Sequence, residues 1–440
     1  LIDPQFAKEQ LLLFTKEWYM SPNGQIPAYE WNFSDVNPPV QALATLEIFK
    51  TDKRKTGKGD IKFLKRIFNK LSLNFTWWVN RLDHNDNNVF QGGFLGLDNI
   101  GVFDRSHGVP GGGVLDQVDG TAWMALYSLN MLELSLEIAK EDDSYEDMAT
   151  KFFGHFIFIA EALNKMDTEK VNTWDDKEGF FYDRLIMPDG RSGTIKVRSI
   201  AGMLAITAVL TISEETLNKF PKFKASINWF RKYRADNLKY QVIQDFSEGN
   251  DLLLSLVPND RMEKLVTALL DEKEFLSPYG IRSLSKIHED PYKIQIDGVD
   301  YAIDYEPAES TVSLFGGNSN WRGPIWMPMN YLFIKSLLEY FSYCKESLTF
   351  EYPHGSGNHL NLQQVSTELS RRLIAIFERD ADGNRPVNLM YQDTYRDEHF
   401  KELVLFYEYF HGENGRGLGA SHQTGWTALV ANLIEEISGD

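Results

Sequence analysis

The stretch 120–134, GTAWMALYSLNMLEL, is apolar or small on almost every side of a helical wheel. A helix without a polar face must be covered all round, so this stretch predicts a helix in the interior of the molecule. Five further stretches share this character and follow loops rich in Gly, Pro, Asp or Asn. They are 38–49 (PPVQALATLEIF), 200–210 (IAGMLAITAVL), 250–257 (NDLLLSLV), 323–338 (GPIWMPMNYLFIKSLL) and 424–434 (TGWTALVANLI).

Six amphipathic segments alternate with these inner ones. In 261–272, apolar residues recur at i, i+3, i+4 and i+7, from Met262 to Leu270, which marks one face of a helix. The same pattern, stronger or weaker, occurs in 3–20, 61–79, 144–163, 215–232 and 363–379. Outer helices that alternate with inner ones predict an all-α fold, an (α/α)6 barrel with six inner and six outer helices and loop decorations.

The alternative to a closed barrel is an open array of helical hairpins. The repeats share no consensus and their loops differ greatly in length, which favours the barrel. Segment 277–322 interrupts the helical rhythm, and its IQIDGVDYAI predicts a short hairpin that turns at Asp297 and Gly298. No clear linker divides the chain, so we expect residues 1–440 to form a single catalytic domain.

Charge and composition exclude several classes of function. Among 440 residues, 45 Lys and Arg against 63 Asp and Glu give a net charge of −18, which disfavours nucleic-acid and anionic-membrane partners. No apolar run is long enough to span a bilayer. The single cysteine, Cys344, excludes an internal disulfide. It fits a reducing compartment, and since no signal peptide is visible we expect a cytoplasmic protein.

Familiar catalytic and cofactor motifs are missing. The sequence has no HExxH, GxxxxGK, GxGxxG or GxSxG motif, and its nine histidines have no metal-ligand spacing. The segment 83–88, DHNDNN, alternates oxygen ligands but lacks the Gly and Glu positions of an EF-hand, so we interpret it as a polar turn. We therefore expect no cofactor and no metal.

The loops before the inner segments bring together carboxylates, tryptophans and glycines, although not every loop contains all three. They are 29–39 (YEWNFSDVNPP), 92–106 (GGFLGLDNIGVFDRS), 115–123 (LDQVDGTAW), 316–326 (GGNSNWRGPIW) and 407–426 (YEYFHGENGRGLGASHQTGW). In a barrel they would meet at one mouth. Aromatic rings stack on sugar faces while carboxylates and amides bind hydroxyl groups, so this mouth predicts a carbohydrate site.

Hydrolysis of a glycosidic bond needs one protonated carboxyl group and one ionised carboxylate. Asp98, which follows Leu97 in a loop rich in Gly and Phe, fits the acid, because an apolar setting raises a carboxyl pKa. Glu408, between Tyr407 and Tyr409, fits the base. The structural alternative for each is a carboxylate that caps a helix or closes a turn.

At these residues the sequence resembles glycoside hydrolase family 63, the processing α-glucosidases and mannosylglycerate hydrolases. The similar blocks run from PNGQIPAYEWNFSDVNPP to GLGASHQTGWTALV and include GGNSNWRGPIW, so they span nearly the whole chain. The resemblance implies an (α/α)6 catalytic domain and an inverting mechanism. It also implies Asp98 as the acid, in a Gly-x-Asp-Asn loop, and Glu408 as the base. Relatives commonly carry an N-terminal β-rich domain, and none is visible in this chain.

The sequence departs from the family pattern after LDN, where IGVFDRS replaces a shorter turn that ends in Arg. Asp104 therefore competes weakly with Asp98, and Arg105 is displaced from the usual Arg position. Glu413 competes weakly with Glu408. We expect Asp119 to bind a sugar hydroxyl or to cap its helix, and Asp116 to be structural.

The predicted function is an inverting α-glycosidase of the α-glucosidase type that removes a terminal α-linked hexose from an oligosaccharide or small glycoside. The alternatives are a catalytically silent glycan-binding barrel and a sugar epimerase or isomerase on the same fold. The residues predicted to bind the substrate are Trp31, Asp35, Asn99, Asp119, Trp321, Arg322, Trp326, Tyr407, Gln423 and Trp426. Trp123, inside an inner segment, is predicted to pack in the core.

Overall fold

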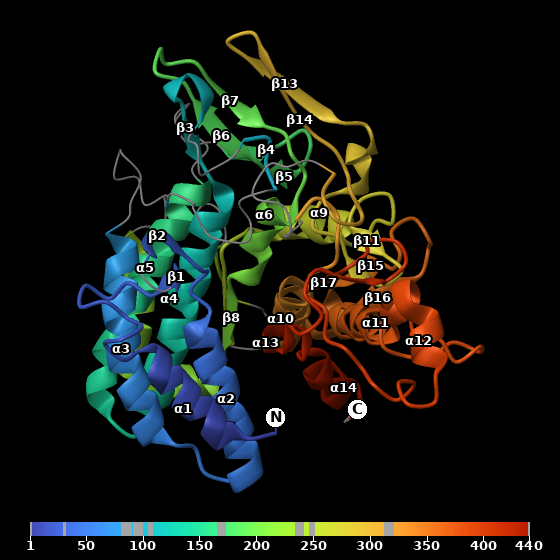
Figure 1. Cartoon of the computed structure of the whole chain (residues 1–440). Helices are drawn as coiled ribbons and strands as arrows, with labels where there is room; N and C mark the ends of the chain where they lie inside the picture. Colours follow the sequence, from blue (N-terminus) through green and yellow to red (C-terminus); the bar gives the residue numbers. More distant parts are fainter. Residues whose placement is uncertain are drawn as a thin grey trace.

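The computed structural model of the chain describes residues 2–29, 32–80, 90, 100–103, 109–164, 173–233, 242–245, 251–311 and 321–438. Within these ranges the chain is rich in helix, as the sequence predicts. Figure 1 shows the N-terminal helices, blue to teal, packed on one side and the C-terminal helices, orange to red, on the other. Small β-hairpins lie above both groups.

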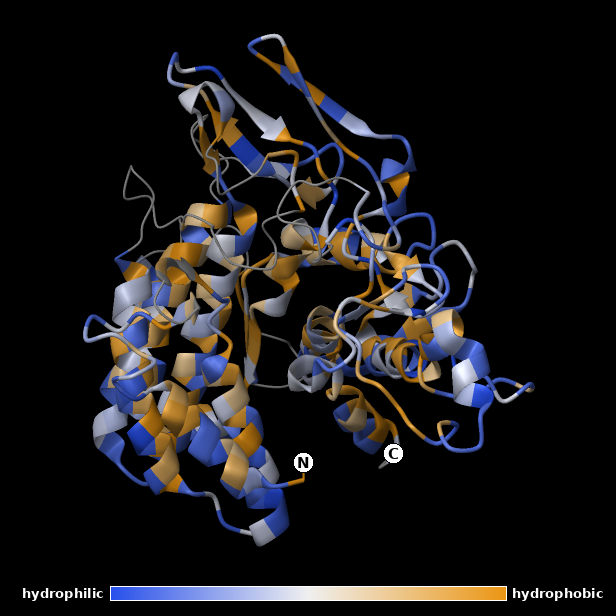
Figure 2. Ribbon diagram, viewed as in Figure 1, coloured by the Kyte–Doolittle hydropathy of each residue, from blue (hydrophilic) through white to orange (hydrophobic). Residues whose placement is uncertain are grey.

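All six predicted amphipathic segments are helical. They form α1 (Pro4–Phe14), α3 (Ile61–Val79), α5 (Glu146–Asn164), the pair α7 (Glu214–Lys219) and α8 (Pro221–Tyr233), α9 (Asn259–Leu269) and α11 (Leu362–Ala375). Side-chain caps begin four of them, α1, α3, α7 and α11. Asp60 accepts a 2.9 Å bond from the Phe63 N–H before α3, and Asn361 and Gln364 cap each other's backbone at α11. Hydrophilic and hydrophobic residues lie side by side along these outer ribbons (Figure 2).

Four of the six predicted inner segments are helical as well. They form α2 (Gln41–Thr56), α4 (Val118–Ala139), α10 (Met327–Cys344) and the pair α13 (Thr424–Thr427) and α14 (Val430–Ser438). Every residue of α4 except Glu133 and Glu137 is buried, and Trp123 lies in the core as predicted. The all-round apolar pattern of 120–134 therefore identified an interior helix correctly.

Two predicted inner helices are wrong. Segment 200–210 begins as the single turn α6 (Ile200–Met203), continues as a 3-10 turn, η4 (Leu204–Thr207), and ends in strand β8 (Val209–Ile212). Segment 250–257 contains strand β10 (Leu252–Ser255), which pairs with β8 and with β9 (Ile243–Asp245) in an antiparallel sheet. A short apolar run buried on both sides has no period that separates strand from helix, which explains the error.

Short strands decorate the helical body. The predicted hairpin is confirmed as β13 (Tyr292–Ile296) and β14 (Val299–Ile303), and Asp297 and Gly298 have positive φ at its turn. The other strands are β1 (Pro27–Tyr29), β2 (Asn32–Val36), β3 (Val114–Asp116), β4 (Trp174–Asp175), β5 (Phe180–Phe181), β6 (Asp183–Ile186), β7 (Ser192–Ile195), β11 (Leu276–Ser277), β12 (Gly280–Ile281), β15 (Thr349–Glu351), β16 (His359–Asn361), β17 (Tyr409–Phe410) and β18 (Gly417–Leu418). Strands β3, β6 and β7 form one sheet, and the rest pair two by two.

One apolar cluster runs through the helical body, from Leu11 in α1 to Leu433 in α14. A second, smaller cluster joins Phe103, Leu185, Leu284 and Ile303 beneath the upper hairpins. The hairpins therefore have their own apolar base, which lies over the end of the body where α4 begins.

Candidate active site

The backbone around Glu408 is pinned to the starts of two inner helices. Ile325, two residues before α10, exchanges two backbone bonds with Phe410 in β17, at 2.8 and 2.9 Å. The Gln423 N–H, just before α13, donates to the Phe406 carbonyl at 2.7 Å. Glu408 therefore lies where the helices α10 and α13 begin.

The Glu408 carboxylate is partly exposed. Its Oε2 accepts a 3.2 Å bond from the Ala420 N–H, and its backbone carbonyl accepts one from Trp426 Nε1 at 2.9 Å. Gly419, at φ +67°, passes so close that a Cβ there would lie 2.7 Å from Oε2. The glycine therefore leaves room for this carboxylate, which the Ala420 N–H holds directly, while the Trp426 bond fixes the backbone of Glu408.

A stack of aromatic rings backs this carboxylate. Trp321 and Trp326 stack with centroids 4.0 Å apart, and Trp326 stacks on Tyr409 at 4.7 Å. Trp426 meets Trp326 edge to face at 5.7 Å and is only partly buried. The structure thus brings three predicted tryptophans together. Trp321 and Trp326 are 5% and 2% exposed and form a supporting wall, whereas Trp426 is only partly buried.

Arg322, the next predicted residue, is 2% exposed. Its Nη1 lies 4.0 Å from Asp304 Oδ1, and its carbonyl accepts the Glu306 N–H at 2.7 Å. Burial lowers the pKa of the Arg322 guanidinium, although the charges of Glu306 and Asp304 oppose that shift. Burial also raises the pKa of Tyr407, whose carbonyl accepts the Thr427 hydroxyl at 2.6 Å.

Glu413, the competitor of Glu408, is held in an ion pair. Its carboxylate accepts bonds from Tyr305 Oη at 2.6 Å and from Arg282 at 3.0 and 3.2 Å, and Lys286 Nζ lies 3.4 Å away. Burial would raise the pKa of Glu413, but the Tyr305 bond and the two positive charges lower it. A carboxylate bound in this way is a weak base, which favours Glu408 for that role.

A second group of polar residues lies at the start of α4. Asp119, in its first turn, is fully buried, and Asp116 is buried at the end of β3. Asp183 of β6, which no sequence pattern indicated, accepts the Val118 N–H with its Oδ1 at 3.1 Å. Asp183 lies 65 residues after Val118, the first residue of the helix that it caps, so no local pattern marked it.

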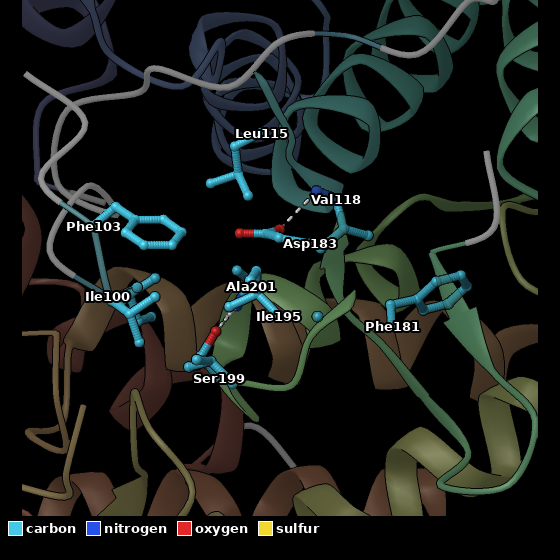
Figure 3. Close-up of a pocket in the computed structure, with 13 residues that line it drawn as sticks. Ile100, Phe103, Leu115, Val118, Phe181, Asp183, Ile195, Ser199 and Ala201 are labelled. Atoms are coloured by element: carbon cyan, nitrogen blue, oxygen red, sulfur yellow. Dashed lines mark hydrogen bonds between the residues drawn. The ribbon is translucent and has the colours of Figure 1, made fainter. Parts of the chain in front are cut away.

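A small cavity lies beside this group, between the starts of α4 and α6. Figure 3 shows the Asp183 carboxylate between Phe103, Leu115 and Val118, and the Ser199 hydroxyl bonded to the Ala201 N–H. The cavity of about 20 Å³ has room for water but not for a hexose. Ile100, two positions after Asp98, lines it.

Backbone pairing connects this wall to the wall that carries Glu408. Ser199 pairs with Leu284, Arg282 pairs with Ile325, and Ile325 pairs with Phe410. Adjacent strands lie about 5 Å apart, so this chain of bridges ties the two walls together at one end of the molecule.

Several predicted site residues lie outside the described residues. They are Trp31, Asp98, Asn99, Asp104 and Arg105, together with segment 83–88. Asp35 belongs to strand β2, and its side chain is not described. Gln423, before α13, is partly exposed.

Two further properties concern only the described part of the chain. There, the His, Cys, Asp and Glu side chains do not gather in a group of three or more that could hold a metal ion. Among the helices in those same ranges, each is too short or too polar to cross a bilayer.

Residues 250–427 match the family model of the mannosylglycerate hydrolase MGH1-like glycoside hydrolase domain. The chain is 47% identical over 455 residues to the uncharacterized protein YMR196W of Saccharomyces cerevisiae, with 99% of this chain and 42% of that protein covered. It is 29% identical over 188 residues to a probable mannosyl-oligosaccharide glucosidase of Schizosaccharomyces pombe, with 42% of this chain and 17% of the relative covered. The chain spans less than half the length of the curated relatives that it matches.

A solved structure agrees on the fold. The GH63 mannosylglycerate hydrolase from Thermus thermophilus, in complex with glucose, superposes with a TM-score of 0.53 at 13% identity. The match covers 99% of this chain and 89% of the other. The predicted resemblance to glycoside hydrolase family 63 is confirmed by the domain match and these relatives.

Proposed function

We propose that this chain, whose residues 250–427 carry an MGH1-like domain of glycoside hydrolase family 63, hydrolyses a terminal α-linked hexose with inversion at the anomeric carbon. The observation that supports this most strongly is the setting of Glu408. A partly exposed, hydrogen-bonded carboxylate stands in front of an aromatic wall, and the partly exposed Trp426 donates to the backbone of the same residue. In this proposal Glu408 is the general base that takes a proton from the attacking water.

Asp98 is the general acid of the proposed reaction and protonates the leaving oxygen as the glycosidic bond breaks. Two described neighbours support this assignment. Phe90 donates its N–H to Thr121 of α4 at 3.1 Å, and Ile100 lines the cavity at the start of the same helix. Ile100 follows Asp98 by two positions in the sequence.

The proposed fold is a single (α/α)6-type domain, in which the sheet β8–β10–β9 stands where regular inner helices were expected. The likeness to the family 63 structure over 99% of the chain supports this arrangement. Inversion also requires a gap of roughly 6.5–9.5 Å between the two carboxyl groups, wide enough for the attacking water.

The proposed substrate is an unphosphorylated α-glucosyl or α-mannosyl compound. Relatives named mannosyl-oligosaccharide glucosidase and mannosylglycerate hydrolase support this class. The net charge of −18 also favours a neutral sugar over a phosphorylated one.

A hydrolysis screen followed by NMR of the first product tests the reaction. The screen should include α-glucosyl disaccharides, glucosylglycerate and mannosylglycerate, and the expected initial product is the β-anomer. An initial α-anomer would refute inversion. Tight sugar binding without turnover of any glycoside would instead support a catalytically silent binding protein.

Substitution of the two carboxyl groups tests their roles. Asp98→Asn and Glu408→Gln should each lower kcat by about 10²–10⁴, the usual contribution of acid or base assistance. The matched control is Glu309→Gln, which removes an exposed carboxylate that lies 3.6 Å from Arg416. Full activity in both test variants, with an unchanged free energy of unfolding, would remove the assignment.

A further inference from the structure

The turn between β17 and β18 is fixed by one buried cation. Arg282 is 2% exposed, and its Nη1 donates to the carbonyls of Glu272, Glu274 and Leu276. Its Nε and Nη2 donate to the two oxygens of Glu413. A guanidinium bound by three carbonyls on one side and a carboxylate on the other has one orientation.

Because Arg282 holds the Glu413 side chain, it also fixes the turn 411–416 that carries Glu413. Its N–H donates to His411 Nδ1 at 3.1 Å, and the Gly412 N–H donates to the Pro307 carbonyl at 2.8 Å. Gly412 lies so close to the body that a Cβ there would be 2.6 Å from Tyr305 Oη. The turn is thus held against Tyr305 by both its side chain and its backbone.

The same cation is also tied to the strand that follows Glu408. Arg282 pairs with Ile325, and Ile325 pairs with Phe410, two residues after Glu408. The proposed base therefore lies beside a hairpin that is held at two points. Phe410 pairs through its backbone with Ile325, and Glu413 forms an ion pair with Arg282.

We infer that Glu413, held by Arg282 and Tyr305, is a positioning residue that sets the direction of the Glu408 carboxylate. This inference rests on the proposed function. Loss of the Glu413 charge loosens the turn 411–416 and misdirects Glu408, and a small displacement at a reacting group is enough to slow catalysis severely.

The first test is a double-mutant cycle in kcat on an activated aryl α-glycoside. Glu413→Gln should lower kcat by about 10–100-fold at nearly unchanged KM, because Glu408 acts on water rather than on sugar binding. In the Glu408→Gln background the same change should have no further effect, since a missing base cannot be misdirected. Equal losses in both backgrounds would show a merely structural role and overturn the inference.

The second test does not depend on activity. Amide hydrogen exchange of peptides that cover 405–420 should become at least about tenfold faster in Glu413→Gln, while the free energy of unfolding of the whole chain changes little. Glu309→Gln, which removes the exposed ion pair of Arg416 in the same turn, is the control and should leave exchange unchanged. Unchanged exchange in Glu413→Gln would refute the role of Glu413 in fixing the turn, even if no glycoside is turned over. Faster exchange together with an inactive wild-type protein would refute the proposed function alone.

Discussion

His288 is a buried imidazole that the fold holds neutral. Its Nε2 accepts the backbone N–H of Arg198 at 2.9 Å, and His288 is 5% exposed. Burial, together with the charge of Arg198, lowers the pKa of His288 to about 4 from an ordinary value of 6.5. The accepting nitrogen must stay unprotonated for this bond to exist.

Protonation of His288 therefore destabilises the folded chain. Because the pKa of His288 is lower in the folded state, the stability that neutral His288 contributes is complete above pH 6.5. It is lost as the pH falls towards 4. The loss from this group should reach at most about 3 kcal/mol. Urea unfolding at several pH values should show a shallower decline between pH 6.5 and 4 for His288→Gln than for the wild type. Parallel curves would contradict the prediction.

Sequence patterns identified some site residues and missed others for a physical reason. Trp321, Trp326 and Trp426 stand in short loops beside inner helices, so the loop composition pointed to them. Arg282, Tyr305 and Asp183 act across 131, 108 and 65 residues of chain. Their roles depend on tertiary contacts that no local pattern records.

Helix α10 illustrates how one side chain can replace a strand partner. Asn330, 2% exposed, accepts the Ile281 N–H at 2.7 Å and donates to the Ile281 carbonyl at 3.1 Å. It thereby pairs both backbone groups of the last residue in β12, next to Arg282.

Asn330→Leu should destabilise the fold strongly because it leaves the buried N–H and carbonyl of Ile281 without their hydrogen-bond partner. The expected loss in the free energy of unfolding is about 2–5 kcal/mol. Ser336→Ala on the same helix is the control. Among the described residues its hydroxyl bonds only to the Leu332 carbonyl within α10, so its loss should cost less than about 1 kcal/mol. Similar losses for the two variants in denaturant titrations would argue against the role of Asn330.

The elements themselves were predictable where their period was clear. The segment 61–79 coincides with α3, because its apolar face repeats over about five turns between an Asp cap and a polar end. Segments 200–210 and 250–257 are apolar on all sides and short, so their strand pairing through Leu254 and Leu210 could not be inferred. Tertiary pairing, rather than local propensity, decides their structure.

At the scale of the whole molecule, the apolar cluster from Leu11 to Leu433 connects the first described helix to the last. Such continuity predicts that the chain unfolds as one unit. Calorimetry should give one transition with similar calorimetric and van't Hoff enthalpies. Two separate transitions would show instead that the chain folds as more than one domain.

Two features of the sequence predicted the helical body of the fold: the alternation of inner and outer helices, and the resemblance to a known family. The long uniform helix 118–139 and the loop GGNSNWRGPIW led to the helical body and to family 63. The upper hairpins over Phe103 and Leu284 were only partly foreseen, because their small cluster joins distant parts of the chain.

The anchoring of Glu413 on Arg282 has a consequence for engineering. Anyone who transplants residues 407–426 onto a different scaffold carries the carboxylates along but leaves their counter-ion behind, 131 residues upstream. In a recipient without a matching guanidinium, the grafted Glu413 would lack its ion pair and Glu408 would not be held in the proposed direction. A portable unit therefore has to include at least the segment around Arg282 together with the segment around Glu408.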